Sequence, residues 1–435
     1  MTEAQFGSFA LVLLLLIACS HLLGLLFTRL RQPRVIGEIL AGLILGPSCL
    51  ARFAPHFSAT IFPVSESASS PDHAVLGFLY TLGMLLLMFH SGAETRRLFG
   101  RDERRETMWL GGLGTLLPFV LVMLAAGWLP LDALSGVAHQ RTATLLVLGI
   151  AVSVTSIPVI SRIFHDMGIL HTRFARLVLG VAVMEDIALW AVLAVATSLA
   201  GAAALSRSAV AWHVFNSILY FSVGLVLGPP LLRRLHRARW NLLAKASPTG
   251  YLCAVLFAYA AVAAVMGVSL VFAAFLAGFA AGCDPELLSD SFESLSKVSY
   301  GIFIPIYFAV VGYRLNLQRD FSLLMFAALV IGGCALKLLS AGLGARAAGF
   351  RGLDAINLAV ATNARGGPGI VLASVAFDAG IVNARFYTAL VLLAIVTSQA
   401  AGAWLEYVMR KGRPLLAAQE VPAAARPDPE QQVAA

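Results

Sequence analysis

Apolar residues along this chain are gathered into long, nearly uninterrupted runs, which short polar or basic stretches separate. One helical crossing of a bilayer needs about 20 predominantly apolar residues, and runs near this length recur along most of the chain. Their length and number exclude a soluble protein with an oversized core. The pattern predicts an all-α polytopic membrane protein with about 13 transmembrane helices. The thirteen segments are roughly 8–28, 35–50, 74–91, 108–130, 141–164, 174–199, 209–231, 250–267, 269–283, 297–313, 321–345, 355–378 and 384–409.

The composition agrees with this assignment, since 59% of the 435 residues are hydrophobic and only 12% are charged. All five cysteines fall inside apolar segments, where they are expected to be small core residues rather than a disulfide framework or a metal cluster. The first apolar run, residues 9–27, has no charged region before it, so a retained span is expected instead of a cleaved signal. Residues 411–435, which are rich in Ala and Pro, are expected to form a disordered cytoplasmic tail.

The distribution of basic residues predicts how the chain is oriented. With the N-terminus outside, 23 of the 31 Lys and Arg residues fall in inside loops and the C-terminal tail, six fall in outside loops, and two fall within the membrane. Cytoplasmic loops carry such an excess of Lys and Arg. The split therefore favours an outside N-terminus, a cytoplasmic C-terminus and an odd number of spans. It also explains the net charge of +8 without a nucleic-acid partner.

A faint internal repeat relates two parts of the chain. The stretches EILAGLILG (residues 38–46) and AFLAGFAAG (residues 274–282) share Leu-Ala-Gly followed by Gly four residues later. They open the second and ninth apolar segments, so segments two to six and nine to thirteen form two five-helix halves. Segment nine follows segment two by seven steps, an odd number, and the halves are therefore expected to insert with opposite topology as inverted repeats.

The fourth segment of each half contains a helix breaker in its middle, SVTSIPVI (residues 153–160) in one and NARGGPGI (residues 363–370) in the other. A single proline in a membrane helix is compatible with a simple kink. Two interruptions at matching positions of inverted halves instead favour crossing half-helices and a binding site near the membrane midplane. The residues expected to break the helices are Pro158, Gly366, Gly367 and Pro368.

Two adjacent carboxylates, Glu185 and Asp186, lie in the middle of the apolar run VAVMEDIALW. Ionisable residues inside a membrane are costly and by default indicate a functional site. Neighbouring residues of a helix point about 100° apart, so the two acids face different partners. We assign Asp186 as the carboxylate that binds a metal cation (Na⁺ or K⁺) or a proton, and Glu185 as a second titrating or structural acid. A site that takes either ion but not both is an antiporter by competition.

Oxygen atoms are the expected ligands of the cation, and the hydroxyls of Thr155 and Ser156 lie beside the first break. Arg365, in the second break, is expected to neutralise the negative C-terminal ends of crossed half-helices. Lys337, the only lysine inside an apolar segment, is expected to pair with one of the two acids, as a static counter-ion or as a proton carrier. Glu38 is expected to be an interface or structural acid.

Other chemistries lack their signatures in this chain. It contains no Gly-x-x-x-x-Gly-Lys-Ser/Thr loop, no Cys/His spacing for zinc and no Gly-x-Ser-x-Gly. No cofactor is expected, and an enzyme is not supported.

Six stretches together resemble the monovalent cation:proton antiporter-2 family, which includes Kef-like proteins and bacterial Na⁺/H⁺ exchangers. The resemblance spans about residues 8–410, nearly the whole chain. In chain order the stretches are QPRVIGEILAGLILGPS, SVTSIPVISRIFHDMGIL, VAVMEDIALWAVLA, AFLAGFAAG, IFIPIYFAVVGYRL and NARGGPGIVL.

The resemblance implies a thirteen-span inverted-repeat fold over residues 1–410, a homodimer, and alternating access by a core moving against a dimerisation domain. The implied core helices are about 108–199 and 321–409, and the implied dimerisation helices are about 8–91 and 209–313. Matching the motifs places the ion-binding aspartate at Asp186, the break hydroxyls at Thr155 and Ser156, the core lysine at Lys337 and the basic residue of the second break at Arg365.

The acid that precedes the binding aspartate departs from the family pattern. It is usually Asp in electrogenic members and Asn in many electroneutral ones, whereas this chain has Glu185. Two acids favour electrogenic exchange, but the extra methylene of glutamate shifts its carboxylate.

The sequence thus predicts a Na⁺ or K⁺/H⁺ antiporter of the cytoplasmic membrane. One alternative is a sodium-coupled symporter of an organic anion on a similar fold, which needs extra polar residues to bind the anion. The other is a non-transporting membrane sensor, in which the buried charges form only a salt-bridge network.

Overall fold

The computed structural model describes residues 3–30, 32–56, 71–98, 104–201 and 207–417. Over these ranges the chain is helical, with no strand beyond an isolated bridge between Ser135 and Val382. The chain divides into two compact units, Met1–Arg97 with Ser206–Phe321 and Leu98–Leu205 with Ser322–Ala435. Each unit therefore combines a segment from each half of the sequence.

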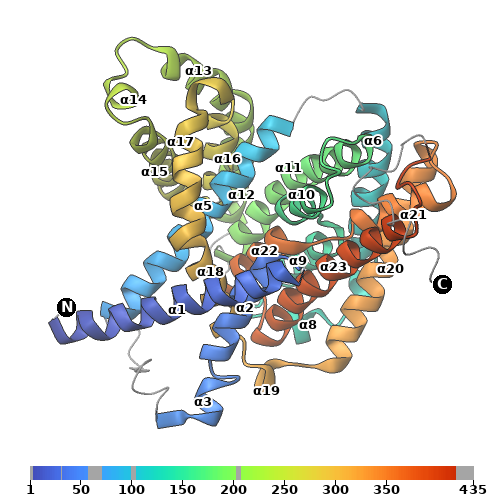
Figure 1. Cartoon of the computed structure of the whole chain (residues 1–435), viewed down its shortest axis with the longest axis horizontal. Helices are drawn as coiled ribbons and strands as arrows, with labels where there is room; N and C mark the ends of the chain where they lie inside the picture. The colour runs from blue at the N-terminus through green and yellow to red at the C-terminus, as the bar shows by residue number, and fades with distance from the viewer. Residues whose placement is uncertain (1–2, 31, 57–70, 99–103, 202–206, 418–435) are drawn as a thin grey trace, which may run out of the picture. The chain divides into compact units, whose positions relative to one another are not determined.

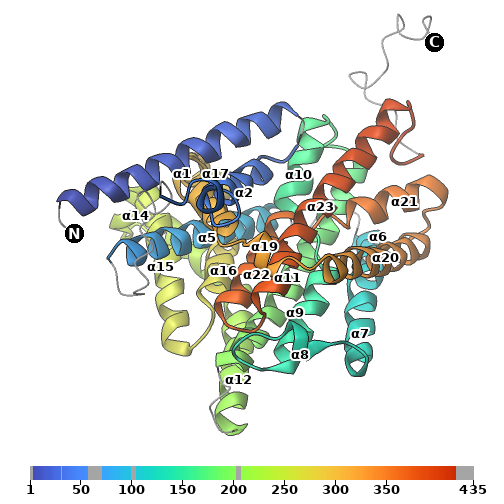
Figure 2. The same ribbon diagram turned by 90° about the horizontal axis from the view of Figure 1, so that it is seen from below.

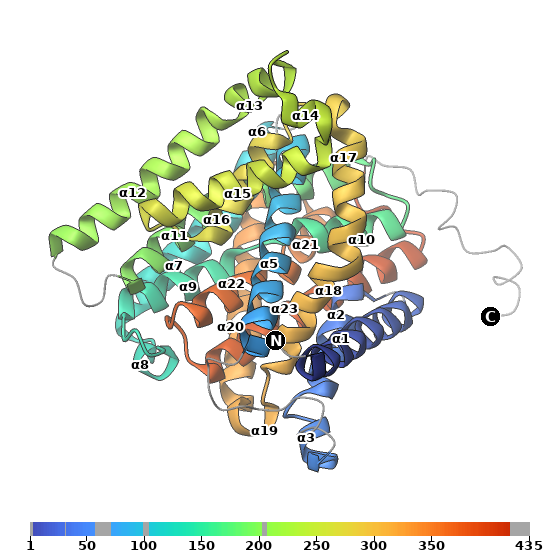
Figure 3. The ribbon, with the colours of Figure 1, turned by 90° about the vertical axis from the view of Figure 1, so that its left-hand side faces the viewer.

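The first unit contains the helices near the N-terminus and those of the middle of the chain (Figure 1). They are α1 (Glu3–Arg29), α2 (Arg34–Leu45), α3 (Leu50–Phe53), α5 (Pro71–Leu98), α12 (Arg207–Val226), α13 (Gly228–Arg237), α14 (Leu242–Ala246), α15 (Pro248–Met266), α16 (Leu270–Ala281), α17 (Pro285–Val298), the π-helix η3 (Ser299–Phe303), α18 (Ile304–Tyr313) and α19 (Leu317–Asp320). Figure 3 shows α15 beside α16 in this unit.

The second unit contains both helix breakers and the adjacent acids Glu185 and Asp186. Its helices are α6 (Arg104–Gly111), the π-helix η1 (Gly112–Leu116), α7 (Leu117–Leu124), the 3₁₀-helix η2 (Ala125–Gly127), α8 (Leu131–Leu134), α9 (Arg141–Ser153), α10 (Ile157–Asp166), α11 (Arg173–Gly201), α20 (Leu323–Ala347), α21 (Gly352–Ala361), α22 (Gly366–Asp378) and α23 (Ala384–Arg410). Figure 1 shows α9, α22 and α23 side by side, and Figure 2 shows α6 beside α20.

Helices lie over all thirteen predicted apolar segments, but they are not thirteen long spans. Ten helical stretches of the described chain are long and apolar enough to cross a membrane, or up to 11 if α12 and α13, bent by 47°, count as one span. Three apolar helices are shorter, namely Leu270–Ala281, Gly352–Ala361 and Gly366–Asp378. The last two occupy one predicted segment as a pair of half-length helices. The all-helical membrane architecture is thus confirmed, whereas the count of thirteen stays a prediction.

In the first unit α2 and α18 cross at a pair of glycines. A Cβ atom added at Gly42 of α2 would lie 1.7 Å from the carbonyl oxygen of Ala309, and one added at Gly312 of α18 would lie 1.9 Å from that of Ile39. Each glycine thus faces the backbone of the partner helix. Small residues let membrane helices approach this closely.

The same arrangement occurs where α16 crosses α5. A Cβ atom added at Gly278 would lie 1.8 Å from the carbonyl oxygen of Phe89, and one added at Gly92 would lie 2.0 Å from that of Phe275. Gly278 occupies the position in its Leu-Ala-Gly stretch that Gly42 occupies in the other. In both crossings each glycine faces the carbonyl three residues before the partner glycine. The faint sequence repeat therefore has a counterpart in two matching helix crossings.

Replacing Gly42 with Ala is expected to destabilise the protein by at least about 1–3 kcal/mol, since the added methyl forces two backbones apart. Unfolding in detergent, followed by circular dichroism, measures the loss. Gly77→Ala is the matched control, because Gly77 lies on α5 with no atom within 4 Å of an added Cβ. Equal stability of the two variants would contradict the close crossing.

The first residues of the predicted disordered tail are ordered. The side-chain amide of Asn357 donates to the carbonyl oxygen of Leu415 at 3.1 Å, and the N–H of Ala417 donates to the Asp354 carboxylate at 3.1 Å. Leu416 is only 1% exposed. The two leucines at the start of the tail, Leu415 and Leu416, are therefore buried, although the tail as a whole is polar. The rest of the predicted tail, residues 418–435, lies outside the described part of the chain.

Candidate functional site

The first breaker is a true interruption of the helix. Residues 154–156 separate α9 from α10, and both Val154 and Ser156 have extended backbone angles. The Ser156 hydroxyl accepts a hydrogen bond from the Val159 N–H at 3.3 Å and so caps α10, while Pro158 occupies the first turn, where its missing N–H is harmless. The sequence TSIP therefore ends one helix and starts another, rather than kinking a continuous one.

The second interruption, residues 362–365, is hydrogen-bonded to the first. The Ser156 N–H donates to the carbonyl oxygen of Ala364 at 2.7 Å, and the Thr155 hydroxyl donates to the carbonyl oxygen of Thr362. Gly366 then begins α22 with a φ of 40°, which favours glycine. A Cβ atom there would also lie 2.3 Å from the side chain of Val159.

Hydroxyl groups of α23 hold the start of α22. The N–H of Arg365 donates to Thr397 Oγ1 at 3.4 Å, and the N–H of Gly366 donates to Ser398 Oγ at 3.0 Å. Both hydroxyls also donate to carbonyl groups of their own helix, at 2.8 Å each. Two of the donors that any helix start leaves unsatisfied are thereby paired.

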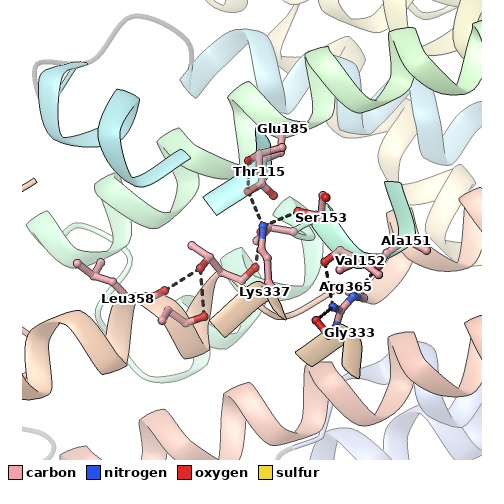
Figure 4. Close-up of polar contacts among 12 residues, drawn as sticks. Thr115, Ala151, Val152, Ser153, Glu185, Gly333, Lys337, Leu358 and Arg365 are labelled. Atoms are coloured by element: carbon pink, nitrogen blue, oxygen red, sulfur yellow. Dashed lines mark hydrogen bonds and ion pairs between the residues drawn. The ribbon is translucent and has the colours of Figure 1, made fainter. Parts of the chain in front are cut away.

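Arg365, which is 1% exposed, lies against the C-terminal end of α9 (Figure 4). Its Nε donates to the carbonyl oxygen of Ala151 at 2.7 Å, and its Nη2 donates to those of Val152 and Gly333 at 3.0 and 3.2 Å. The last carbonyls of a helix carry partial negative charge. The guanidinium thus lies where the sequence placed a compensating cation, at a half-helix C-terminus.

Lys337 and Glu185 form an ion pair in which both side chains are 0% exposed, with 2.7 Å between Nζ and Oε1. The ammonium also donates to the carbonyl oxygen of Ser153, the last residue of α9. Thr115, in the π-helix η1, donates its hydroxyl to the same Glu185 oxygen at 2.7 Å. Figure 4 shows these side chains converging from α11, α20 and η1. Between the two acids, the partner of Lys337 is Glu185.

Asp186 is 0% exposed and follows Glu185 on α11, so its side chain leaves the helix in a different direction. Helix α11 packs against α9, α10, α21 and α22, which are the half-helices of both breaks. The structure therefore brings the breaks, Arg365, Lys337 and Glu185 together by direct hydrogen bonds, with Asp186 buried beside them. Glu38 lies in the other unit, where it pairs with Arg34 at 2.9 Å.

Three side chains of this site escaped the sequence analysis, namely Thr115, Thr397 and Ser398. Each is a hydroxyl inside an apolar run, where Ser and Thr commonly bond a carbonyl of their own helix. The available signal for Thr115 was its place at the end of the glycine-rich stretch GGLGT, most of which forms the π-helix η1. Nothing in the sequence distinguished Thr397 and Ser398.

The polar atoms of the site are almost all oxygens, apart from the nitrogens of Lys337 and Arg365. No group of three or more His, Cys, Asp or Glu side chains that could hold a metal ion occurs among the described residues. The donors present are carboxylate, hydroxyl and main-chain oxygens, which suit alkali-metal ions better than transition metals.

Comparison with known proteins finds a family model and relatives that are named as cation/proton antiporters. The family model described as "Sodium/hydrogen exchanger, transmembrane" matches residues 12–411. The K(+)/H(+) antiporter 1 of Saccharomyces cerevisiae is 29% identical over 405 residues, which are 88% of this chain and 44% of the yeast protein. The Na(+)/H(+)-K(+) antiporter GerN of Bacillus cereus is 24% identical over 409 residues, 93% of this chain and 96% of GerN.

The chain spans about half the length of the first curated relatives it matches, with 44% of the yeast protein and 47% of the Arabidopsis thaliana Cation/H(+) antiporter 18 covered. Among solved structures, the sodium proton antiporter MjNhaP1 from Methanocaldococcus jannaschii has the same fold, with a TM-score of 0.61. That match has 14% identity and covers 92% of this chain and 96% of MjNhaP1.

Proposed function

This chain belongs to the sodium/hydrogen exchanger family and is a multi-pass membrane protein, and from this premise we propose that it is a secondary active antiporter. It exchanges a monovalent cation, Na⁺ or K⁺, for protons across the cytoplasmic membrane by alternating access. Its relatives include antiporters named for Na⁺, for K⁺ and for both.

The observation that carries the proposal is a fully buried set of charges at two helix breaks that are hydrogen-bonded to each other. Glu185, Asp186, Lys337 and Arg365 are each at most 1% exposed. Burying this much charge in an apolar helix bundle is expensive, and membrane proteins keep such residues where ions pass or bind. Broken helices with exposed carbonyls are the usual cation site of inverted-repeat transporters.

Asp186 exchanges the two ions in this proposal. Glu185 Oε1 accepts from Lys337 and Thr115, so we assign Glu185 to the ion pair and Asp186 to the exchange of cation and proton. Hydroxyls of Thr155 and Ser156, main-chain carbonyls of the breaks and water complete the oxygen shell. Lys337 acts as the counter-ion that fixes Glu185 at the end of α9.

Two buried oxygens beside this ion pair support a site that holds water or an ion. Glu185 Oε2 and Ser153 Oγ have no hydrogen-bond partner among the described residues. Buried oxygens are rarely left unsatisfied in native proteins. A hydrated cation, or the water that replaces it, supplies what both atoms lack.

We assign a transport role to one unit and a dimerisation role to the other according to where the buried charges lie. The second unit, with both breaks and the ion pair, is the proposed core, and the first unit is the proposed dimerisation domain. The division of the chain into two compact units supports this assignment. We place the N-terminus outside and the C-terminus in the cytoplasm, and we expect a homodimer in the lipid bilayer.

An organic-anion symporter is less well supported. An anion needs a cationic or neutral donor to receive it. Among the described residues of the second unit, the buried cations are Lys337 and Arg365, and both already donate to protein oxygens. A sensor without transport leaves the orphaned oxygens and the paired helix breaks unexplained.

Everted membrane vesicles test the proposal. Addition of Na⁺ or K⁺ to vesicles with an imposed pH gradient is expected to dissipate that gradient, as reported by a pH-sensitive dye. A wild-type protein that gives no response to Na⁺, K⁺ or Li⁺ would show that it is not a cation/proton antiporter.

A further inference from the structure

The π-helix η1 is an irregular turn inside an otherwise regular membrane helix. It joins α6 to α7 without a gap, and two of its five residues, Gly112–Leu116, are glycines. Turns of this kind are rare and are frequently found at functional sites. The contacts of η1 therefore bear on what this turn contributes to the exchange reaction.

Glycines place this turn close to both helices that carry the buried ion pair. A Cβ atom added at Gly114 of η1 would lie 3.4 Å from the Cα of Ala341, which lies one turn after the buried lysine on α20. One added at Gly111, directly before η1, would lie 3.5 Å from the Cε of Met184, the residue that precedes the buried glutamate on α11. The turn is thus packed near both partners of the pair.

Thr115 of η1 donates its hydroxyl to a side chain of another helix (Figure 4). It is 6% exposed, and its Oγ1 lies 2.7 Å from Glu185 Oε1. A helical threonine commonly donates to a carbonyl of the preceding turn, as Thr81 of α5 donates to the carbonyl oxygen of Gly77 at 2.9 Å. A hydroxyl has one hydrogen to donate. The hydrogen of Thr115 is therefore committed to the carboxylate.

Glu185 Oε1 accepts two hydrogen bonds, from Thr115 and from Lys337 Nζ, each at 2.7 Å. Hydrogen bonds to a carboxylate favour its charged form. A proton that neutralised Glu185 would have to occupy Oε2, and both bonds to Oε1 would weaken with the loss of charge. The two donors therefore resist protonation of this acid.

Two cations and one acid are the charged neighbours of Glu185. Lys337 and Arg365 interact electrostatically with it and favour its negative charge, whereas Asp186 opposes that charge when ionised. Protonation of Asp186 removes this opposition, so Glu185 keeps its charge during that step. The other charged residues of the helices that pack against α11 lie at or toward helix ends, namely Arg104, Arg105 and Glu106 of α6, Arg141 of α9, Arg162, His165 and Asp166 of α10, Asp354 of α21 and Asp378 of α22.

We propose that Thr115 is a positioning residue of the exchange reaction, whose hydroxyl keeps Glu185 ionised and paired with Lys337 so that Asp186 alone exchanges protons. This inference rests on the proposed antiport function and deepens it, because it couples one proton to each cation at this site. Without the hydroxyl, protonation of Glu185 Oε2 costs less, and the second acid joins the competition with the cation.

The pH dependence of the cation KM in proteoliposomes tests the inference, because it counts the protons that the cation displaces. In wild type KM is expected to rise by up to about tenfold per unit of acidification, as for one proton. Thr115→Val keeps the shape of the side chain but not its hydroxyl. Its KM is expected to rise more steeply in the acidic range, by up to about a hundredfold per unit, as for two protons. Thr115→Ser restores the hydroxyl and is expected to restore the wild-type slope.

Thr81→Val is the matched control, since it removes a hydroxyl that bonds its own helix, and it is expected to keep the one-proton slope. Thr115→Ala replaces the valine variant if the latter does not elute as folded protein. A two-proton slope in wild type, or a one-proton slope in the folded variant without the hydroxyl, would overturn the inference while the antiporter stands. A wild type that exchanges no cation would contradict the proposed function itself.

Discussion

Asp186→Asn is expected to abolish cation-driven dissipation of a pH gradient in everted vesicles. The amide has the shape of the carboxyl group but neither binds a proton near neutral pH nor carries a charge for the cation. Substitutions of groups that only support a ligand cost about 10–100-fold in metal affinity or activity. Removing the charge of the ligand itself should therefore cost at least about 100-fold, because no second carboxylate in this proposal is available to replace it.

Asp290→Asn is the matched control, since Asp290 is an exposed acid on α17. It is expected to transport as wild type does. Both variants should elute as folded protein in size-exclusion chromatography, so that a loss of exchange in Asp186→Asn reports chemistry rather than folding. Wild-type exchange by Asp186→Asn would remove this residue from the mechanism.

Breaking the Glu185–Lys337 pair is expected to give the largest loss of stability. Lys337→Met leaves the Glu185 carboxylate buried with one hydroxyl donor, and Glu185→Gln leaves the ammonium buried without its negatively charged partner. An uncompensated charge in a protein interior costs about 3–5 kcal/mol. Each single variant should lower the free energy of unfolding by about 3–5 kcal/mol.

The double variant Glu185→Gln with Lys337→Met is expected to recover much of the loss, because it buries no net charge. A double-mutant cycle from unfolding in detergent measures this coupling. Glu293 and Lys297 offer the control, since they form an exposed pair at 2.7 Å on α17. Breaking that pair should have no measurable effect. Single variants at Glu185 and Lys337 that are as stable as wild type would contradict the buried pair.

The sequence identifies the charged part of the site because charge in an apolar run has few structural explanations. Glu185, Asp186, Lys337 and Arg365 all stand out for this reason, and the structure buries all four. The sequence does not reveal which of the two acids, Glu185 or Asp186, pairs with Lys337. That choice depends on how α11 is rotated, and a rotation of about 100° exchanges the two residues.

The uncharged part of the site is much harder to predict. Thr397 and Ser398 each donate to a carbonyl of their own helix, as hydroxyls in apolar helices commonly do, and their second role as acceptors for the start of α22 depends on tertiary packing. Likewise, Thr115 meets Glu185 only because η1 packs near α11 and α20. Such contacts between distant segments leave no local pattern.

The fold shows the same limit. Hydropathy alone treats α21 and α22 as one run of residues 355–378, because the break between them is short and contains no long polar stretch. The helix breaker NARGGPGI is the signal that predicts the interruption. The Leu-Ala-Gly repeat is visible in the sequence, whereas nothing in the sequence marks Gly92 and Gly312 as the glycines that pack against it. They matter only because two helices cross there, and single glycines are common in membrane helices.

The most direct test of the central claim measures how the apparent KM for the transported cation depends on pH in proteoliposomes. If one carboxylate binds either ion, protons compete with the cation, so KM should rise by up to about tenfold for each unit of acidification while the maximal rate at saturating cation holds. A KM that stays constant across the acidic range, with only the maximal rate falling, would mean that proton and cation occupy separate sites.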